Sequence, residues 1–280
     1  MIERRSFRSM GTTVELLVEA GDAESQLDAC EAEFERLEQV MSRFRPDSEL
    51  SQLNRDGWID ASADLAGVVE LAIAARERTG GAFDPTVHHA LEAAGYDRTF
   101  TELPDDTADD AVPAACGGRV VVDGRRIEIE DGFGIDLGGI GKGFAAERVA
   151  ERLALAGPCL VDAGGDIAVR GIPEGGAWTI AVDDELTLGI VAGGVATSGR
   201  DRRVWRRAGK ARHHLIDPVT GRPSETDLVR VTVVATDAIE AEVLAKSLFL
   251  AGSATASAAD VPAVLVTEDG RRLTTGGLGS

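Results

Sequence analysis

The chain has 280 residues, a length that suits one elaborate domain or two closely packed lobes with a large core. Its formal net charge of −19 argues against nucleic acid or an anionic membrane surface as a partner, because both require a basic face. Hydrophobic residues make up 44% of the chain, so a soluble globular protein is expected.

The cysteines and the N-terminal residues favour a cytoplasmic location. Cys30, Cys116 and Cys159 are far apart and odd in number, and no CxxC or Cys/His cluster occurs, so we expect a reducing compartment and no structural zinc site. Residues 1–20 contain neither a signal-peptide apolar run nor a lipid-accepting cysteine. No apolar run approaches the roughly 18 residues of a membrane-spanning helix, so no membrane segment is expected.

The first half of the chain predicts a strand, helices and a hairpin. Residues 11–19 are β-branched and partly alternate, which favours a strand, whereas 23–40 carry apolar residues at helical spacing. Asp47 or Ser48 is a plausible N-cap for a short helical turn. The remaining predictions are a helix over 62–79 that ends at a glycine pair, an acidic surface excursion over 104–118, and a hairpin around Asp123-Gly124.

The second half alternates strands and helices around glycine-rich turns. We predict a helix over 141–156, a later helix over 237–251 and a last hairpin around Asp269-Gly270. The expected strands are 158–170, 177–182, 190–197 and 229–236. The fold class is therefore α+β, a mixed α/β chain whose glycine-rich turns are the expected binding loops.

The glycine-rich segment Asp136–Gly143 (DLGGIGKG) is a candidate phosphate loop. Glycines let the backbone approach a ligand, and the N-terminus of the helix that follows favours an anion. Lys142 adds a point charge suited to phosphate. The segment matches neither a Walker A loop nor the dinucleotide-binding pattern, so a purely structural turn remains an alternative.

Two further segments place polar groups where a ligand could reach them. Asp84 stands before a proline and is held extended, so its carboxylate is either displayed at a loop or closes an Asx-type turn. His214 precedes Asp217 by three residues on a short extended run, which suits acid–base chemistry but also suits an ordinary strand.

Smaller signals complete the candidate site. Thr197 and Ser198 follow an apolar run and suit a tight ligand wall, and the Gly164-Gly165-Asp166 turn offers one carboxylate. The pair His88 and His89 lies in a probable helix and is interpreted as surface or packing residues.

Taken together and in this order, these segments resemble the ApbE family of FAD:protein FMN transferases. The resemblance implies one compact ApbE-like domain over residues 1–280, with the flavin site in a cleft between two lobes. It also implies magnesium-dependent transfer of FMN from FAD to a threonine or serine hydroxyl of a target flavoprotein, with release of AMP. The matching segments are Met10–Thr12, Met41–Asn54, Gly81–Val87, Asp136–Gly143, Gly164–Asp166, Ala196–Gly199, His214–Gly221 and 231–252.

The resemblance also implies roles for individual residues. His214 is expected to act as the base on the target hydroxyl, and Asp136 and Lys142 to contact FAD from the glycine loop. Phe44 stands where the family often has tyrosine, which keeps an aromatic ring and loses a hydroxyl. The other expected contacts to the flavin or the adenosine are Met10, Ala82, Phe83, Asp84 and Leu215.

The metal site departs from the family pattern. There the last helix reads roughly ADxLxT, and the aspartate, the threonine and a backbone carbonyl hold the metal. Here Glu242 and Lys246 stand at those two side-chain positions, and the expected carbonyl donors are Gly139 and Ala245. An ammonium offers no lone pair and repels a dication.

Three interpretations of Glu242 and Lys246 follow. Lys246 swings aside and Mg²⁺ still binds through Glu242, carbonyls and phosphate; or Lys246 replaces the metal; or the two side chains form a solvated pair one helical turn apart. They lead to different functions, since a protein in which Lys246 replaces the metal could bind FAD without catalysis. A third candidate is an FAD pyrophosphatase, in which water replaces the target hydroxyl and FMN and AMP are released.

Overall fold

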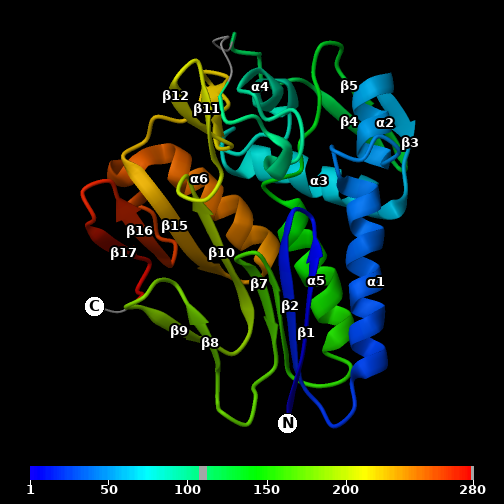
Figure 1. Ribbon diagram of the computed structural model, residues 1–280, viewed down its shortest axis with the longest axis vertical. Coiled ribbons are helices and arrows are strands. Elements are labelled where there is room, and N and C mark those ends of the chain that lie inside the picture. The colour runs from blue at the N-terminus through cyan, green and yellow to red at the C-terminus, as the bar shows by residue number, and fades with distance from the viewer. Residues whose placement is uncertain (107–111, 279–280) are drawn as a thin grey trace.

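One antiparallel sheet organises the computed structural model, which describes residues 1–106 and 112–278 (Figure 1). Its strands are β1 (Ile2–Ser9), β2 (Thr12–Glu19), β6 (Cys159–Ala163), β7 (Asp166–Arg170), β10 (Gly193–Gly199), β15 (Leu228–Ala235), β16 (Ala263–Thr267) and β17 (Arg272–Thr275). They lie in the order β1-β2-β6-β7-β10-β15-β16-β17, and every neighbouring pair is antiparallel.

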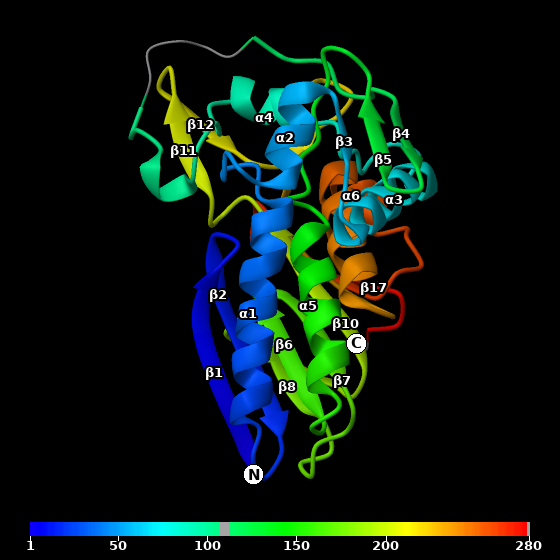
Figure 2. The ribbon, with the colours of Figure 1, turned by 90° about the vertical axis from the view of Figure 1, so that its right-hand side faces the viewer.

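Helices cover one face of this sheet. Val14, Leu16 and Val18 are buried at every second position of β2, as expected for a strand with one face in the core. Figure 2 shows the long helices against the sheet: α5 packs on β6 and β7, α1 packs on α5, and α6 packs on β10 and β15. These helices are α1 (Glu24–Met41), α5 (Gly141–Leu153) and α6 (Ala238–Ala256).

A small hairpin covers part of the other face. Strands β8 (Trp178–Ala181) and β9 (Thr187–Ile190) pair with each other. Trp178 and Ile180 of β8 pack with Leu160, Ile167 and Val195, which point away from the helices. The register explains this division. Val161 and Ala168 are paired across β6 and β7 and belong to the core under the helices, so their neighbours Leu160 and Ile167 face the hairpin.

The remaining elements form the part of the molecule beyond the end of α1 (Figure 1). Its helices are α2 (Glu49–Asp56), α3 (Ala63–Arg78), α4 (His88–Ala93) and the short 3₁₀ helix Phe100–Glu102. Its strands are β3 (Trp58–Asp60), β4 (Val120–Asp123), β5 (Arg126–Ile129), β11 (Val204–Arg207), β12 (Lys210–His213), β13 (Ile216–Asp217) and β14 (Arg222–Pro223). Ser48 caps α2 by accepting a hydrogen bond from the backbone of Ser51, as one of the two cap candidates predicted.

Most predicted elements are confirmed, and three require correction. The run 158–170 is not one strand but the hairpin β6–β7, which reverses at Gly164 and Gly165, both at positive φ. The run 190–197 is divided between the end of β9 and β10. The final helix continues beyond 251 to Ala256 across a kink at Gly252, where φ is 77°.

Strand β1 was not predicted, because charged residues stand at both the exposed and the half-buried positions of this edge strand and leave no apolar alternation. Of the predicted excursion 104–118, residues 107–111 lie outside the described residues, and Val112 and Pro113 are exposed. Within the described part of the chain, no helix has the length and apolar character needed to cross a membrane.

Candidate functional site

A cavity of about 960 Å³ lies where the large sheet meets the region that carries α2 and α4. This volume is at the upper end of the range of roughly 300–1,000 Å³ for small-molecule sites. The sheet contributes residues of β7 and β10, and the other region contributes residues near α2 and α4, so the predicted cleft is present. Predicted site residues on its wall are Met10, Phe44, Asp136, Gly139, Lys142, Thr197, Ser198, His214, Leu215, Glu242 and Lys246.

The glycine loop is held rigidly against its neighbours. The side-chain amide of Asn54 donates to the carbonyl of Ile135 at 2.8 Å and accepts from the N–H of Ile135 at 2.7 Å. Helix α5 starts at Gly141 on the cavity wall. Gly143 is required by packing, because a Cβ there would lie 2.6 Å from the carbonyl oxygen of Ala238. The loop therefore presents the positive end of α5 to the cavity.

Asp136 is paired with an arginine that the sequence analysis did not assign. Arg43 Nε lies 2.8 Å from Asp136 Oδ2, and both side chains are largely buried. The guanidinium carbon of Arg43 lies 4.1 Å from the ring centre of Phe44 and 4.6 Å from that of Tyr96. Arg43 Nη2 is buried without a hydrogen-bond partner in the described residues, so this planar cation keeps a free donor beside the cavity.

Lys142 connects the glycine loop to β7 and α6. Its ammonium donates to Glu242 Oε1 at 2.9 Å and also forms an ion pair with Asp166. The other oxygen of Glu242 accepts the backbone N–H of Gly143 at 2.8 Å. Lys142, Asp166 and Glu242 therefore form one network in which two carboxylates share the single ammonium of Lys142.

Lys246 lies one turn after Glu242 but does not pair with it. Lys246 is 6% exposed and Glu242 is 3% exposed, which is inconsistent with a solvated surface pair. The Lys246 ammonium lies 5.4 Å from the ring centre of Phe83. A Cβ added to Gly139 would lie 2.8 Å from Lys246 Cδ, so the lysine runs directly beneath the glycine loop. Burial lowers the pKa of Lys246, while Asp136 and Glu242 act against this effect.

His214 lies between β12 and β13 with a free ring nitrogen. Its Nδ1 is buried and has no hydrogen-bond partner among the described residues. Burial lowers the pKa of His214 well below its usual value of 6.5, and the charges of Arg203 and Lys246 lower it further. The imidazole is therefore neutral near pH 7 and can accept a proton.

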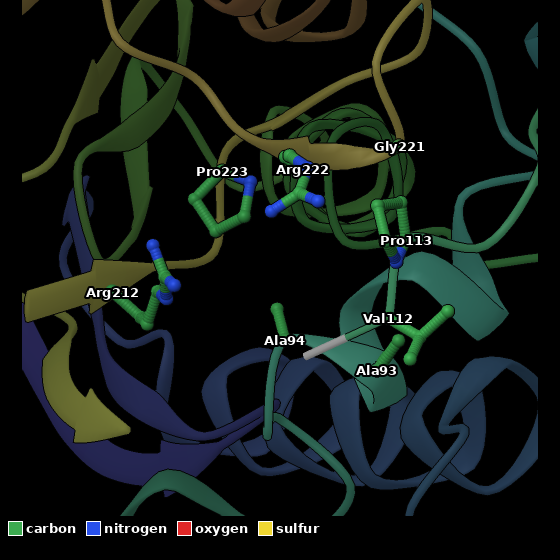
Figure 3. A pocket seen from close by; sticks show the side chains of 8 residues that line it. All are labelled: Ala93, Ala94, Val112, Pro113, Arg212, Gly221, Arg222 and Pro223. Atoms are coloured by element: carbon green, nitrogen blue, oxygen red, sulfur yellow. The ribbon is translucent and has the colours of Figure 1, made fainter. Parts of the chain in front are cut away.

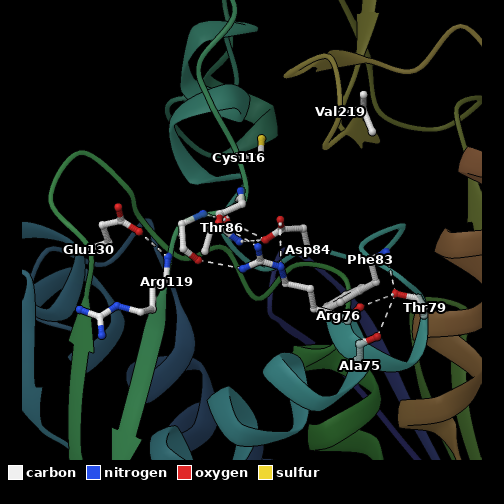
Figure 4. Close-up of polar contacts among 12 residues, drawn as sticks. Ala75, Arg76, Thr79, Phe83, Asp84, Thr86, Cys116, Arg119, Glu130 and Val219 are labelled. Carbon is white, nitrogen blue, oxygen red and sulfur yellow. Dashed lines mark hydrogen bonds and ion pairs between the residues drawn. The ribbon is translucent and has the colours of Figure 1, made fainter.

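Four predicted site residues do not line the cavity. Phe83 and Ala245 are packed in the core, and Ala82 lies in the turn before Phe83. Asp84 forms the Asx-type turn that was its structural alternative: its Oδ1 accepts from the backbone N–H and the hydroxyl of Thr86, both at 2.7 Å. Figure 4 shows Arg76 on the other side of this carboxylate, with Arg76 Nε 3.5 Å from Asp84 Oδ2.

A second hollow lies beside α4 and β14, where Arg212 and Arg222 face Ala94 and Pro113 (Figure 3). Its volume is about 10 Å³, which is close to the space that one water molecule needs. It is therefore too small for a nucleotide.

Comparison with known proteins identifies the family. The model of the ApbE family matches residues 10–262. The chain belongs to the ApbE family. A curated ApbE relative from Vibrio cholerae, an FAD:protein FMN transferase, is 31% identical and the match covers 94% of this chain and 87% of the relative. The FAD:protein FMN transferase of Treponema pallidum is 28% identical, with 83% of this chain and 73% of the relative covered.

Solved ApbE structures have the same fold. The ApbE protein of Thermotoga maritima superposes with a TM-score of 0.87 at 26% identity, over 98% of this chain and 97% of that chain. The flavin transferase ApbE of Vibrio cholerae superposes with a TM-score of 0.78 at 25% identity, over the same shares of the two chains. The α+β fold and its single ApbE-like architecture are thereby confirmed.

The residues expected to hold Mg²⁺ in this ApbE member do not fit the ion. The Lys142 ammonium already contacts Glu242, and Lys246 brings a second positive charge to the position of the other side-chain ligand. Among the residues that the structure describes, one group of three His, Cys, Asp or Glu side chains brings its ligand atoms within 4.8 Å of one another: His88, His89 and Glu92, outside this cavity.

Sequence reasoning missed Arg43 and underrated Asp166. Arg43 stands in a segment that was recognised as an ApbE match, but arginines are numerous in this chain and none stood out. Asp166 was noted as a possible ligand carboxylate, and it proves to be a partner of Lys142. The useful signal was its position directly after two glycines, which reverse the chain beside the cavity.

Proposed function

We propose that this protein transfers the FMN moiety of FAD to the hydroxyl group of a threonine or serine in a target protein and releases AMP. Membership of the ApbE family supports the proposal, since relatives that match most of the chain are FAD:protein FMN transferases. The cavity of about 960 Å³ has room for a dinucleotide.

The reaction requires one proton acceptor and stabilisation of negative charge. The hydroxyl oxygen forms a bond to the FMN phosphorus, and the bond from that phosphorus to the bridging oxygen breaks, so AMP leaves with that oxygen. The proton of the hydroxyl passes to the base. Charge on the phosphates is stabilised by cations and by the N-terminus of a helix, here Lys142, Lys246 and α5.

The observation that carries the proposal is the position of His214. It lies on the wall of the same cavity as the glycine loop, is neutral near pH 7, and has an Nδ1 with no partner among the described residues. A neutral imidazole in this setting is suited to accept the hydroxyl proton. Thr197, Ser198 and Leu215, on the same wall, would position the nucleotide.

The direct test is an incubation of the purified protein with FAD and a library of peptides that contain threonine or serine. Samples with magnesium and with EDTA are compared, mass spectrometry follows the peptides, and chromatography follows AMP. A peptide that gains the mass of FMN with release of AMP supports the transferase. FMN and AMP without an adduct would identify an FAD pyrophosphatase instead.

A second candidate function is FAD binding without catalysis. The specific observation in its favour is the ammonium of Lys246 at a position where ApbE members are expected to hold a metal. Intact bound FAD, with neither adduct nor AMP in either buffer, would contradict the transferase and support this binder.

A further inference from the structure

We propose that the Lys246 ammonium takes the place of a divalent cation in this protein and contacts the pyrophosphate of the bound dinucleotide, so that FAD binds without metal. The inference rests on the proposed function only for the identity of the ligand. Its physical basis is a buried cation that has no ion pair among the described residues, beside carboxylates that other groups already contact.

The charge of Lys246 is buried without a direct partner. Lys246 is 6% exposed and lines the cavity, and no hydrogen bond or ion pair of its ammonium occurs among the described residues. The ammonium lies 5.4 Å from the centre of the Phe83 ring. Burial of an unpaired charge is strongly unfavourable, so a retained lysine here indicates an anion that pairs with it when ligand binds.

The carboxylates around Lys246 have other partners. Asp136 pairs with Arg43, and Glu242 accepts from Lys142 and from the backbone of Gly143. Asp84 is held by Thr86 and faces Arg76. None of them is left to neutralise Lys246 by a direct contact, although Asp136, Glu242 and Asp84 all favour its charged form from a distance.

The Lys246 ammonium lies at the glycine loop. A Cβ added to Gly139 would lie 2.9 Å from Lys246 Nζ, which places the charge directly against the backbone of the glycine loop. Gly141 and Lys142, at the start of α5, line the same cavity. The N-terminus of α5 and the Lys246 ammonium therefore both border the cavity at the glycine loop, an arrangement that suits the phosphates of a dinucleotide.

A metal ion and the Lys246 ammonium exclude each other at this place. A dication at this place would require lone pairs, which an ammonium cannot give, and at Glu242 it would meet the Lys142 ammonium that already contacts Oε1 at 2.9 Å. The positive charge of Lys246 would also repel the ion over a short distance in a poorly solvated site. One side chain thus supplies charge to the phosphates where an ion would otherwise be needed.

The test measures FAD affinity and not transfer. Titration calorimetry is performed on the full chain in EDTA and in excess magnesium, first with FAD and then with riboflavin, which lacks phosphate. We expect the dissociation constant for FAD to agree within about twofold between the two buffers. We expect Lys246→Met to weaken FAD binding by roughly tenfold to a hundredfold, the range for a lost charge-assisted hydrogen bond, and to leave riboflavin binding unchanged.

Controls separate charge from packing. Lys210→Met removes a lysine that lies in β12, outside the cavity, and should leave FAD affinity unchanged. Lys246→Arg keeps the charge and should lose less affinity than Lys246→Met. If wild-type binding of FAD is abolished by EDTA and restored by magnesium, the inference is overturned without recourse to any variant.

The outcomes also separate this inference from the proposed function. Metal-free binding of FAD that depends on Lys246, with no transfer to any peptide, would support the inference and contradict the transferase. FAD binding that is lost in EDTA, together with transfer that occurs only with magnesium, would support the transferase and overturn the inference. An absence of FAD binding in both buffers would contradict both.

Discussion

Two parts of the cavity wall differ in how completely their charges are paired. In the paired part, Arg43 neutralises Asp136 through Nε and keeps one donor, Nη2, without a partner among the described residues, and Lys142 is held between Asp166 and Glu242. In the unpaired part, the Lys246 ammonium and His214 Nδ1 have no partner among the described residues. The first part fixes the shape of the site, and the second leaves polar groups unsatisfied until a ligand arrives. Such violations of polar pairing are expected where a protein binds or reacts, and they are offset by stability elsewhere.

The largest effect is expected from removal of the unpaired base. His214→Gln should lower the rate of FMN transfer by roughly a hundredfold to ten-thousandfold, the usual contribution of a general base, with FAD affinity almost unchanged. Single-turnover transfer to an acceptor peptide measures the rate. The matched control is His213→Gln, since His213 is the preceding residue, bonds the carbonyl of Ser224 and does not line the cavity. Equal loss in the two variants would mean that His214 has only a structural role.

A substitution in the paired part should lower the stability of the protein. Glu242→Gln removes the negative charge that Lys142 contacts and weakens the acceptor of the Gly143 N–H. We expect the free energy of unfolding to fall by about 1–3 kcal/mol, as for a buried polar group deprived of its partner. Urea denaturation measures the change. Glu151→Gln, at an exposed position of α5, is the control and should change it by less than about 0.5 kcal/mol. Equal effects would show that the buried network contributes no stability.

A substitution in the unpaired part should instead raise the stability of the ligand-free protein. Lys246→Met replaces an unpaired buried cation with an apolar side chain of similar length, so we expect the free energy of unfolding without ligand to rise by about 1–2 kcal/mol. The same variant is expected to bind FAD less tightly, which is the usual opposition between stability and function. A loss of stability in this variant would mean that Lys246 is already satisfied in the free protein.

The sequence contained most of the fold because its local signals agree with the tertiary structure. The spacing of Leu27, Cys30 and Phe34 predicts α1, and all three are buried in the core as that spacing requires. The hairpin β6–β7 was predicted as one strand because both of its strands are apolar, and hydrophobicity alone does not record a reversal of direction. The kink at Gly252 escaped prediction because α6 resumes after it.

The sequence predicted many of the residues that line the site, but it did not predict which of them form ion pairs with one another. Helical spacing places Glu242 and Lys246 on one face, and both side chains are indeed buried beside the cavity. The true partner of Glu242 is Lys142, which is 100 positions away in the chain, so no local spacing could identify it. Likewise Asp136 and Arg43 come from distant segments that meet only when the glycine loop folds against the end of α1.

The smallest effect, and the most specific to the unpaired part, is on the pH dependence of transfer. Burial, Arg203 and Lys246 all lower the pKa of His214, so the neutral, active form persists as the pH falls below the usual histidine value of 6.5. The acid limb of kcat/KM should therefore lie below pH 6.5. Lys246→Met removes one of the charges that lower this pKa, so the limb should move upward, towards the ordinary value. A limb that already lies at the ordinary value in wild type, or that does not move in the variant, would show that Lys246 and His214 do not act on the same charge.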